Sequence, residues 1–131
     1  MYIAQGKISI VKLLHAKDNL VEFRQAVQSN MSITASIQAF EYTYELYWKI
    51  LRKVLIQVYG VSDLTGSARV VFQKAAELNL IKDLDFWIAC IDKRNETVHT
   101  YEETAALELY NFLPNFLQEL EQAIIKLQEL K

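Results

Sequence analysis

The sequence contains few of the residues that make turns and end helices. It has three glycines and one proline among 131 residues, whereas antiparallel β folds use both types in most of their turns. Because 52% of the residues are hydrophobic, the chain can bury a core and has too much apolar content for a disordered protein. These features favour long helices joined by short connections, in one domain that spans residues 1–131.

Cysteines and long apolar runs are also scarce. Cys90 is the one cysteine, so no internal disulfide can form, and its apolar neighbours favour a buried, unreactive thiol. The N-terminus has no long apolar stretch of the kind that directs secretion. No window reaches the ~18 uncharged apolar residues that a membrane-spanning helix needs. We therefore expect a cytoplasmic protein that does not span a membrane.

Charge and ligand residues exclude several functional classes. The formal net charge is −2, so only a local basic patch could hold nucleic acid. Two histidines and one cysteine without ligand spacing argue against a structural zinc site, and no glycine-rich phosphate loop is present. The sequence also lacks a nucleophile paired with histidine and an acid. We expect neither a metal nor a cofactor.

Apolar residues recur at helical spacing in five segments, at positions 7–28, 32–59, 67–79, 83–98 and 102–130. Ser32 is expected to cap the second segment and Gly60 to follow its end. That segment has apolar residues on two sides, so it should lie centrally in the bundle or in a dimer interface. Pro114 should kink or briefly interrupt the last segment near Leu113. The fold class that follows is all-α, an up-and-down four-helix bundle with a short extra helix.

The second segment also has a charged face, with Glu41, Glu45, Lys49 and Arg52 three or four positions apart. One interpretation is a solvated face in which Glu45 and Lys49 form a favourable pair. The other is that Lys49, Arg52 and Lys53 contact RNA phosphates. The pattern alone leaves both open.

The fourth segment breaks its own pattern near its end. Asn95 falls on a stripe that is otherwise apolar, with Arg94 beside it and His99 four positions later. Polar residues on a buried stripe need partners, and a local rule broken at one place often marks a functional site. The alternative is a capped helix end, where His99 meets the terminal carbonyls and Arg94 pairs with a nearby acid such as Glu96 or Glu102.

The run from Arg94 to Tyr101 resembles the signature of the HEPN family, in the Arg-x4-His-x-Tyr form found in HEPN proteins encoded beside small nucleotidyltransferases. Positions 40–49 and 92–105 are similar to the two hallmark segments of the nucleotidyltransferase substrate-binding subfamily. The resemblance covers the chain from Ser32 to its end. It implies a HEPN-like helical bundle that forms a homodimer, with the motifs near the dimer cleft.

The resemblance further implies a metal-independent endoribonuclease toxin that a partner nucleotidyltransferase antitoxin neutralises. His99 would act as general acid or base, Arg94 would hold the phosphate, and Asn95 would orient His99 or the phosphate. Tyr101 would receive AMP from the partner, which adds negative charge at the RNA cleft. Two alternatives are a non-catalytic substrate- or nucleotide-binding subunit of the transferase and a structural dimer module with a degenerate motif.

Overall fold

The computed structural model describes residues 1–62, 64 and 66–130. Positions 63 and 65 of the connection expected at 61–66 lie outside the described residues. The elements, in chain order, are β1 (Tyr2–Ile3), β2 (Ile8–Ser9), α1 (Val11–Gln25), α2 (Asn30–Gln57), α3 (Ala68–Glu77), α4 (Leu84–Glu96), a 3-10 turn η1 (Thr97–His99) and α5 (Glu103–Gln128).

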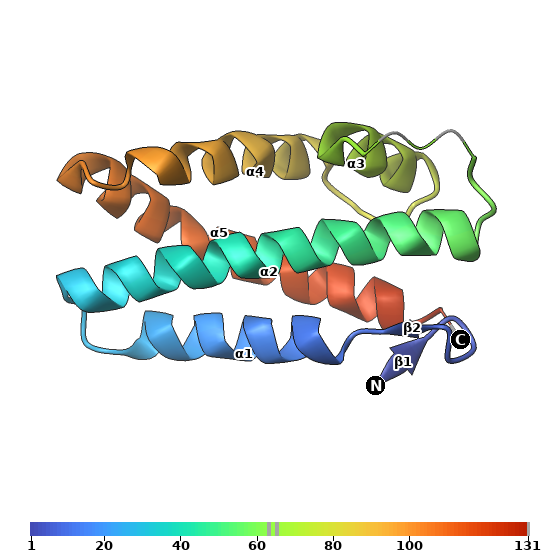
Figure 1. Ribbon diagram of the computed structural model, residues 1–131, viewed down its shortest axis with the longest axis horizontal. Helices are drawn as coiled ribbons and strands as arrows, with labels where there is room; N and C mark the ends of the chain where they lie inside the picture. Colours follow the sequence, from blue (N-terminus) through green and yellow to red (C-terminus); the bar gives the residue numbers. More distant parts are fainter. Residues whose placement is uncertain (63, 65, 131) are drawn as a thin grey trace.

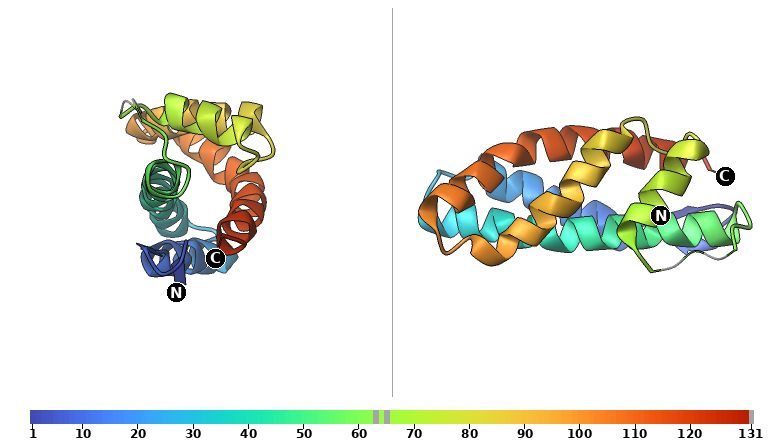
Figure 2. Two further views of the ribbon diagram at one scale, coloured as in Figure 1. Left: turned by 90° about the vertical axis from the view of Figure 1, so that its right-hand side faces the viewer. Right: turned by 90° about the horizontal axis from the view of Figure 1, so that it is seen from above.

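Helices α1, α2, α4 and α5 run up and down along the long axis of the molecule (Figure 1). Seen end-on they surround one interior, with α1 beside α2 and α4 beside α5 (Figure 2). The short helix α3 packs on α2 and α4 near the end where α2 finishes. The predicted four-helix bundle with one short extra helix is therefore confirmed. Among the described residues, no helix is long and apolar enough to cross a membrane.

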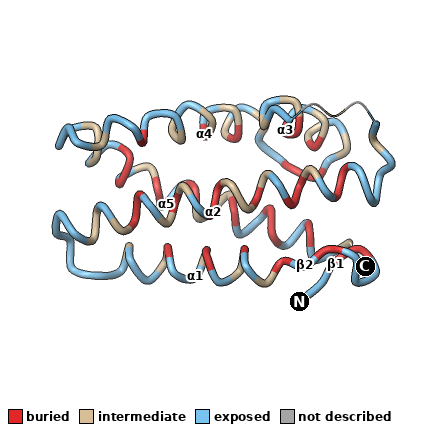
Figure 3. The backbone as a smooth tube through the Cα atoms, viewed as in Figure 1, coloured by how far each residue is buried: buried red, intermediate tan, exposed pale blue. Residues whose placement is uncertain are grey.

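The core is built around α2, which contacts α1, α3 and α5. Buried positions line the inner side of every helix (Figure 3). At the centre, Phe40 of α2 meets Phe116 of α5 with ring centroids 4.8 Å apart. Tyr47 of α2 meets Trp87 of α4 at 4.7 Å, and Phe72 of α3 closes the cluster at 5.5 Å from Trp87. Aromatic contacts of this kind fix the spacing between helices as well as burying area.

The N-terminus departs from the prediction. The first helix begins at Val11 rather than near position 7, because residues 2–9 form a small antiparallel hairpin that pairs Ile3 with Ile8. Its turn places Gly6 at a φ of 80°, a left-handed conformation that glycine adopts without strain. Ala4 donates its backbone N–H to the carbonyl of Leu130 at 2.8 Å. The hairpin thus joins the two ends of the described chain.

The start of α2 also differs from the expectation. Ser29, and not Ser32, is the N-cap, and the two serines form a reciprocal capping box. The Ser32 backbone N–H donates to Ser29 Oγ at 3.1 Å, while the Ser29 N–H donates to Ser32 Oγ at 2.8 Å. At the other end, Gly60 has a φ of 66° and follows the helix as expected.

Pro114 does not interrupt the last helix, so the predicted short break near Leu113 was wrong. Helix α5 is continuous from Glu103 to Gln128. Pro114 lies on the exposed side, whereas Leu113 and Phe116 beside it are fully buried. The missing N–H costs one backbone hydrogen bond, and burial of the apolar face on both sides offsets that cost.

Candidate functional site at the end of α4

One line of residues along α4, which we call the buried line, faces the interior of the bundle and consists of Trp87, Cys90, Arg94 and Thr97. Asp83 caps the helix, since its Oδ1 accepts the backbone N–H of Phe86 at 3.0 Å. Trp87 and Cys90 are buried, and Arg94 and Thr97 continue the same line at spacings of four and three. The line therefore runs from apolar to polar.

Asn95 is not on this buried line. It is exposed, and the stripe to which it belongs is only half-buried at Ile88 and Ile91 and exposed at Val98. The prediction that Asn95 interrupts a buried stripe was therefore wrong. Arg94 and Thr97 are the polar residues that face inward.

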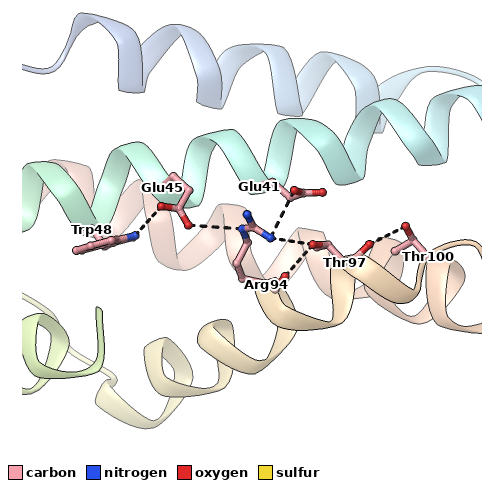
Figure 4. A network of polar contacts seen from close by, with 6 residues as sticks. All are labelled: Glu41, Glu45, Trp48, Arg94, Thr97 and Thr100. Atoms are coloured by element: carbon pink, nitrogen blue, oxygen red, sulfur yellow. Dashed lines mark hydrogen bonds and ion pairs between the residues drawn. The ribbon is translucent and has the colours of Figure 1, made fainter. Parts of the chain in front are cut away.

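The Arg94 guanidinium joins α4 to α2 (Figure 4). Its Nη1 donates to Thr97 Oγ1 at 2.9 Å and lies 3.5 Å from Glu41 Oε2. Its Nε lies 3.5 Å from Glu45 Oε1. Thr97 Oγ1 in turn donates to the Arg94 carbonyl at 2.8 Å. The separations from the glutamates are those of ion pairs rather than of short hydrogen bonds, and the side chain is fixed from three directions.

Glu45 is itself held by other side chains. Trp48 Nε1 donates to Glu45 Oε2 at 3.1 Å, and Lys49 Nζ lies 3.9 Å from the same oxygen. Tyr44 is buried behind the cluster, and burial raises the pKa of its phenol; Cys90 and Glu45 act in the same direction, while Arg94 opposes them. The cluster is thus a charged layer over an uncharged phenol.

His99 lies beyond the end of α4 and is exposed. The helix finishes at Glu96 rather than Val98, and His99 ends the 3-10 turn, where its carbonyl accepts the N–H of Glu102 at 3.0 Å. Tyr101 follows with 79% of its surface exposed, its ring centroid 6.3 Å from that of His99. Among the hydrogen bonds and ion pairs of the described residues, none joins Arg94 to His99. Arg94 and His99 are therefore not joined by a polar contact.

The helix-end interpretation of Arg94 was wrong about its partners. Arg94 pairs with acids of α2, and Glu96 pairs instead with Lys93, at 3.7 Å. The acids Glu41 and Glu45 were not singled out as site residues. Their spacing of four on the charged face of α2 was a signal, but which arginine they meet depends on how α4 packs.

The basic residues of α2 do not gather around His99. Lys49 pairs with Glu45, and Arg52 Nη2 donates to the carbonyl of Leu64 at 3.5 Å. Lys53 is exposed. Arg52 lies eleven positions after Glu41, or roughly 16 Å along the helix at ~1.5 Å per residue. Lys49 is therefore the member of this group that borders the Arg94 cluster.

Metal ligands do not gather in the described part of the chain. No group of three or more His, Cys, Asp or Glu side chains is placed there to hold a metal ion.

Comparison with known proteins agrees with this architecture. A family model described as nucleotidyltransferase substrate binding protein like matches residues 10–129. The probable ribonuclease HepT of Haemophilus influenzae is 31% identical over 103 residues, which make up 77% of this chain and 70% of that protein. The hairpin at residues 1–9 lies outside the family match.

Two solved structures are similar over nearly their whole length. A protein of Thermus thermophilus superposes with a TM-score of 0.81 at 30% identity, covering 88% of this chain and 98% of its own. A Haemophilus influenzae structure, described as revealing the fold of a substrate binding domain of a nucleotidyltransferase, has a TM-score of 0.78 at 27% identity and covers 93% and 98%. The chain therefore belongs to the nucleotidyltransferase substrate-binding-like subfamily of the HEPN family.

Proposed function

We propose that this protein is a HEPN-type, metal-independent endoribonuclease toxin, active as a homodimer and neutralised by a partner nucleotidyltransferase antitoxin. The observation that carries the proposal is an exposed His99 at the end of the turn that follows α4, five positions after an arginine that is ion-paired with two glutamates. The similarity to a protein named as a probable ribonuclease supports it. Exposed apolar and aromatic side chains around the same end, Val98, Tyr101 and Leu107, suit burial against a second copy.

The residue types suit cleavage of RNA by its own 2′-hydroxyl. His99 takes the 2′-hydroxyl proton as the 2′-oxygen attacks the adjacent phosphorus, since the ordinary pKa of histidine is near neutral. The 5′-oxygen leaves and receives a proton, which gives a cyclic phosphate and a free 5′-hydroxyl. Arg94 stabilises the charge that grows on the phosphate oxygens. Asn95, exposed beside Arg94, orients the phosphate or His99.

Tyr101 is the regulatory residue in this proposal. Its hydroxyl oxygen attacks the α-phosphorus of ATP held by the partner transferase, pyrophosphate leaves, and an adenylate remains on the tyrosine. The side chain is 79% exposed and its ring lies 6.3 Å from that of His99. An adenylate there adds negative charge and bulk where RNA would approach.

The test is cleavage of total tRNA and of a generic single-stranded RNA by the purified chain in EDTA. His99→Ala should lower the rate by at least about 100-fold, the usual contribution of general acid–base catalysis. His15→Ala is a matched control, because His15 is also exposed but lies on α1, and it should cleave like the wild type. Equal rates for His99→Ala and His15→Ala would contradict the proposed role of His99.

A non-catalytic partner subunit is the second candidate. Two observations favour it: the net charge is −2, and the positive charge of Arg94 is compensated by Glu41 and Glu45. This candidate expects a stable mixed complex with the transferase on size-exclusion chromatography. It also expects no RNA cleavage by the folded, unmodified chain, whereas the toxin proposal requires cleavage.

A further inference from the structure

The two glutamates on Arg94 are held very differently. Glu45 also accepts a hydrogen bond from Trp48 Nε1 and pairs with Lys49 Nζ, so its carboxylate has two partners besides Arg94. Glu41 has Arg94 as its one ion-pair partner among the described residues. The carboxylate of Glu41 is therefore the more easily displaced of the two.

The two contacts also use different parts of the guanidinium. Nε is buried and has no hydrogen-bond partner in the described part of the chain, so the nearby charge of Glu45 compensates it. Removing that charge would leave a buried donor uncompensated. Nη1 serves both Thr97 and Glu41, and Nη2 makes no hydrogen bond among the described residues.

A phosphate is best held by two parallel N–H groups of the arginine fork. With Nε directed at Glu45, the pair left for a phosphate is Nη1 with Nη2. One of the two Nη1 hydrogens is used by Thr97, so the second, which faces Glu41, must be released. Glu41 thus occupies the direction from which a phosphate oxygen would approach.

We propose that Glu41 holds the place of a phosphate oxygen on Arg94 and is displaced when a phosphodiester binds, whereas Glu45 stays and positions the guanidinium. The proposal rests on the proposed function in one respect, that the ligand of Arg94 is a nucleic-acid phosphate. Glu41 is a specificity residue, because a ligand must outcompete its carboxylate for Arg94. Glu45 is a positioning residue, because it holds the guanidinium in place. A half-exposed ion pair such as Arg94–Glu41 is weak enough to be exchanged in this way.

The test measures binding without cleavage. A fluorescently labelled single-stranded DNA oligonucleotide, which has no 2′-hydroxyl to attack, is titrated with each variant and followed by anisotropy. Glu41→Gln should bind about two- to fivefold more tightly than the wild type, in keeping with the strength of such ion pairs. In an Arg94→Gln background the gain should vanish, because the competition needs the arginine.

Two control variants distinguish competition for Arg94 from a general effect of the protein's net charge. Glu121→Gln removes the same charge at an exposed position of α5 and should change affinity little. Glu45→Gln should give no gain, although it removes a charge as close to Arg94 as that of Glu41. In the RNA cleavage assay Glu45→Gln should lower kcat more than it raises KM, because the guanidinium is no longer fixed.

Every result of these measurements either supports or overturns the proposed role of Glu41. Equal gains for Glu41→Gln and Glu45→Gln, a gain that survives in the Arg94→Gln background, or no binding by any variant would overturn the inference. The expected binding pattern with no cleavage of RNA would support the inference and contradict the ribonuclease proposal. Cleavage by the wild type without the expected binding pattern would do the reverse.

Discussion

The two ends of α4 use the same buried line for different purposes. At the first end, Trp87 and Cys90 are packed among rings and aliphatic side chains. At the other end, Arg94 and Thr97 face α2 through ion pairs and a hydrogen bond, and His99 and Tyr101 beyond them are exposed. The first end holds the helix in the bundle through buried apolar area and close packing of side chains. The second has charge and exposure, which suit binding of a ligand more than stability.

The difference predicts that stability and activity separate along one helix. Substitutions near Trp87 should lower the free energy of unfolding and affect any activity only through the folded fraction. Substitutions of the exposed residues Val98, His99 and Tyr101 should leave the fold intact, and those of His99 and Tyr101 should act on function. Four variants test this separation, in order of decreasing expected effect on the free energy of unfolding.

Trp87→Ala should lower the free energy of unfolding by about 3–5 kcal/mol, because it empties a large, fully buried site. Urea denaturation followed by circular dichroism measures the change. Val98→Ala is the contrast at the other end, where the side chain is 67% exposed, and should stay within about 0.5 kcal/mol of the wild type. Similar losses of stability in the two variants would show that the two ends of α4 do not differ in their contribution to folding.

Thr97→Val should cost about 1–2 kcal/mol, because it keeps the shape and leaves Arg94 Nη1 without its short acceptor. Thr104→Val, at an exposed position near the start of α5, is the control for the chemical change itself. Thermal and urea unfolding of the pair measure the difference. If both variants unfold alike, the hydroxyl of Thr97 does not hold the cluster.

Cys90 should make the free energy of unfolding decrease at alkaline pH. Burial, and then Glu119, raise the pKa of its thiol above the ordinary 9.0. The unfolded chain loses the thiol proton first, so this contribution to stability is complete below pH 9 and declines as the pH rises above it. Burial likewise raises the phenol pKa of Tyr47, which adds to the decline at higher pH.

Cys90→Ala isolates the thiol contribution. It should cost about 1 kcal/mol at neutral pH, since a small buried side chain is shortened. The gap between the wild type and Cys90→Ala should then narrow by about 1 kcal/mol between about pH 8.5 and pH 10, from the linkage slope for one proton. Urea midpoints at several pH values measure it, and a gap that stays constant or widens would contradict the buried, protonated thiol.

Tyr101→Phe should have the smallest effect on folding, within about 0.5 kcal/mol, because the side chain is 79% exposed. It should nevertheless abolish adenylate transfer from the partner transferase and ATP, as measured by intact mass. Tyr2→Phe, at a tyrosine that is 67% exposed in the hairpin, should be labelled like the wild type. Labelling of Tyr101→Phe would show that another residue accepts the adenylate.

Much of the fold followed from local patterns. Apolar spacing gave the number and order of the helices, and Gly60 and Asp83 mark helix boundaries by chemistry that acts within a few residues. The misplaced features depend on packing. Helix α5 continues through Pro114 because of what its other face buries, and the hairpin is hydrogen-bonded to Leu130 at the far end of the chain.

The candidate site was predictable only in part. Arg94, His99 and Tyr101 stood out through their spacing and its resemblance to a family motif, and the helix does end before His99. Asn95 was expected on a buried stripe, but the spacing of three or four that it shares with Ile91 and Val98 fits a half-buried stripe as well as a buried one. The charged face of α2 that carries Glu41 and Glu45 was predictable, but their pairing with Arg94 was not, because it joins residues more than forty positions apart in the chain.

The hydrogen bond from Ala4 to Leu130 has a practical consequence. Both ends of the described chain lie at the same end of the bundle, and the turn that contains His99 lies at the opposite end (Figure 1). The 26 residues of α5 that separate them span roughly 39 Å at ~1.5 Å per residue. A surface tether or fluorophore attached at either terminus would therefore lie far from the turn that contains His99, and a second dye near Tyr101 would report on that turn from a well-separated position.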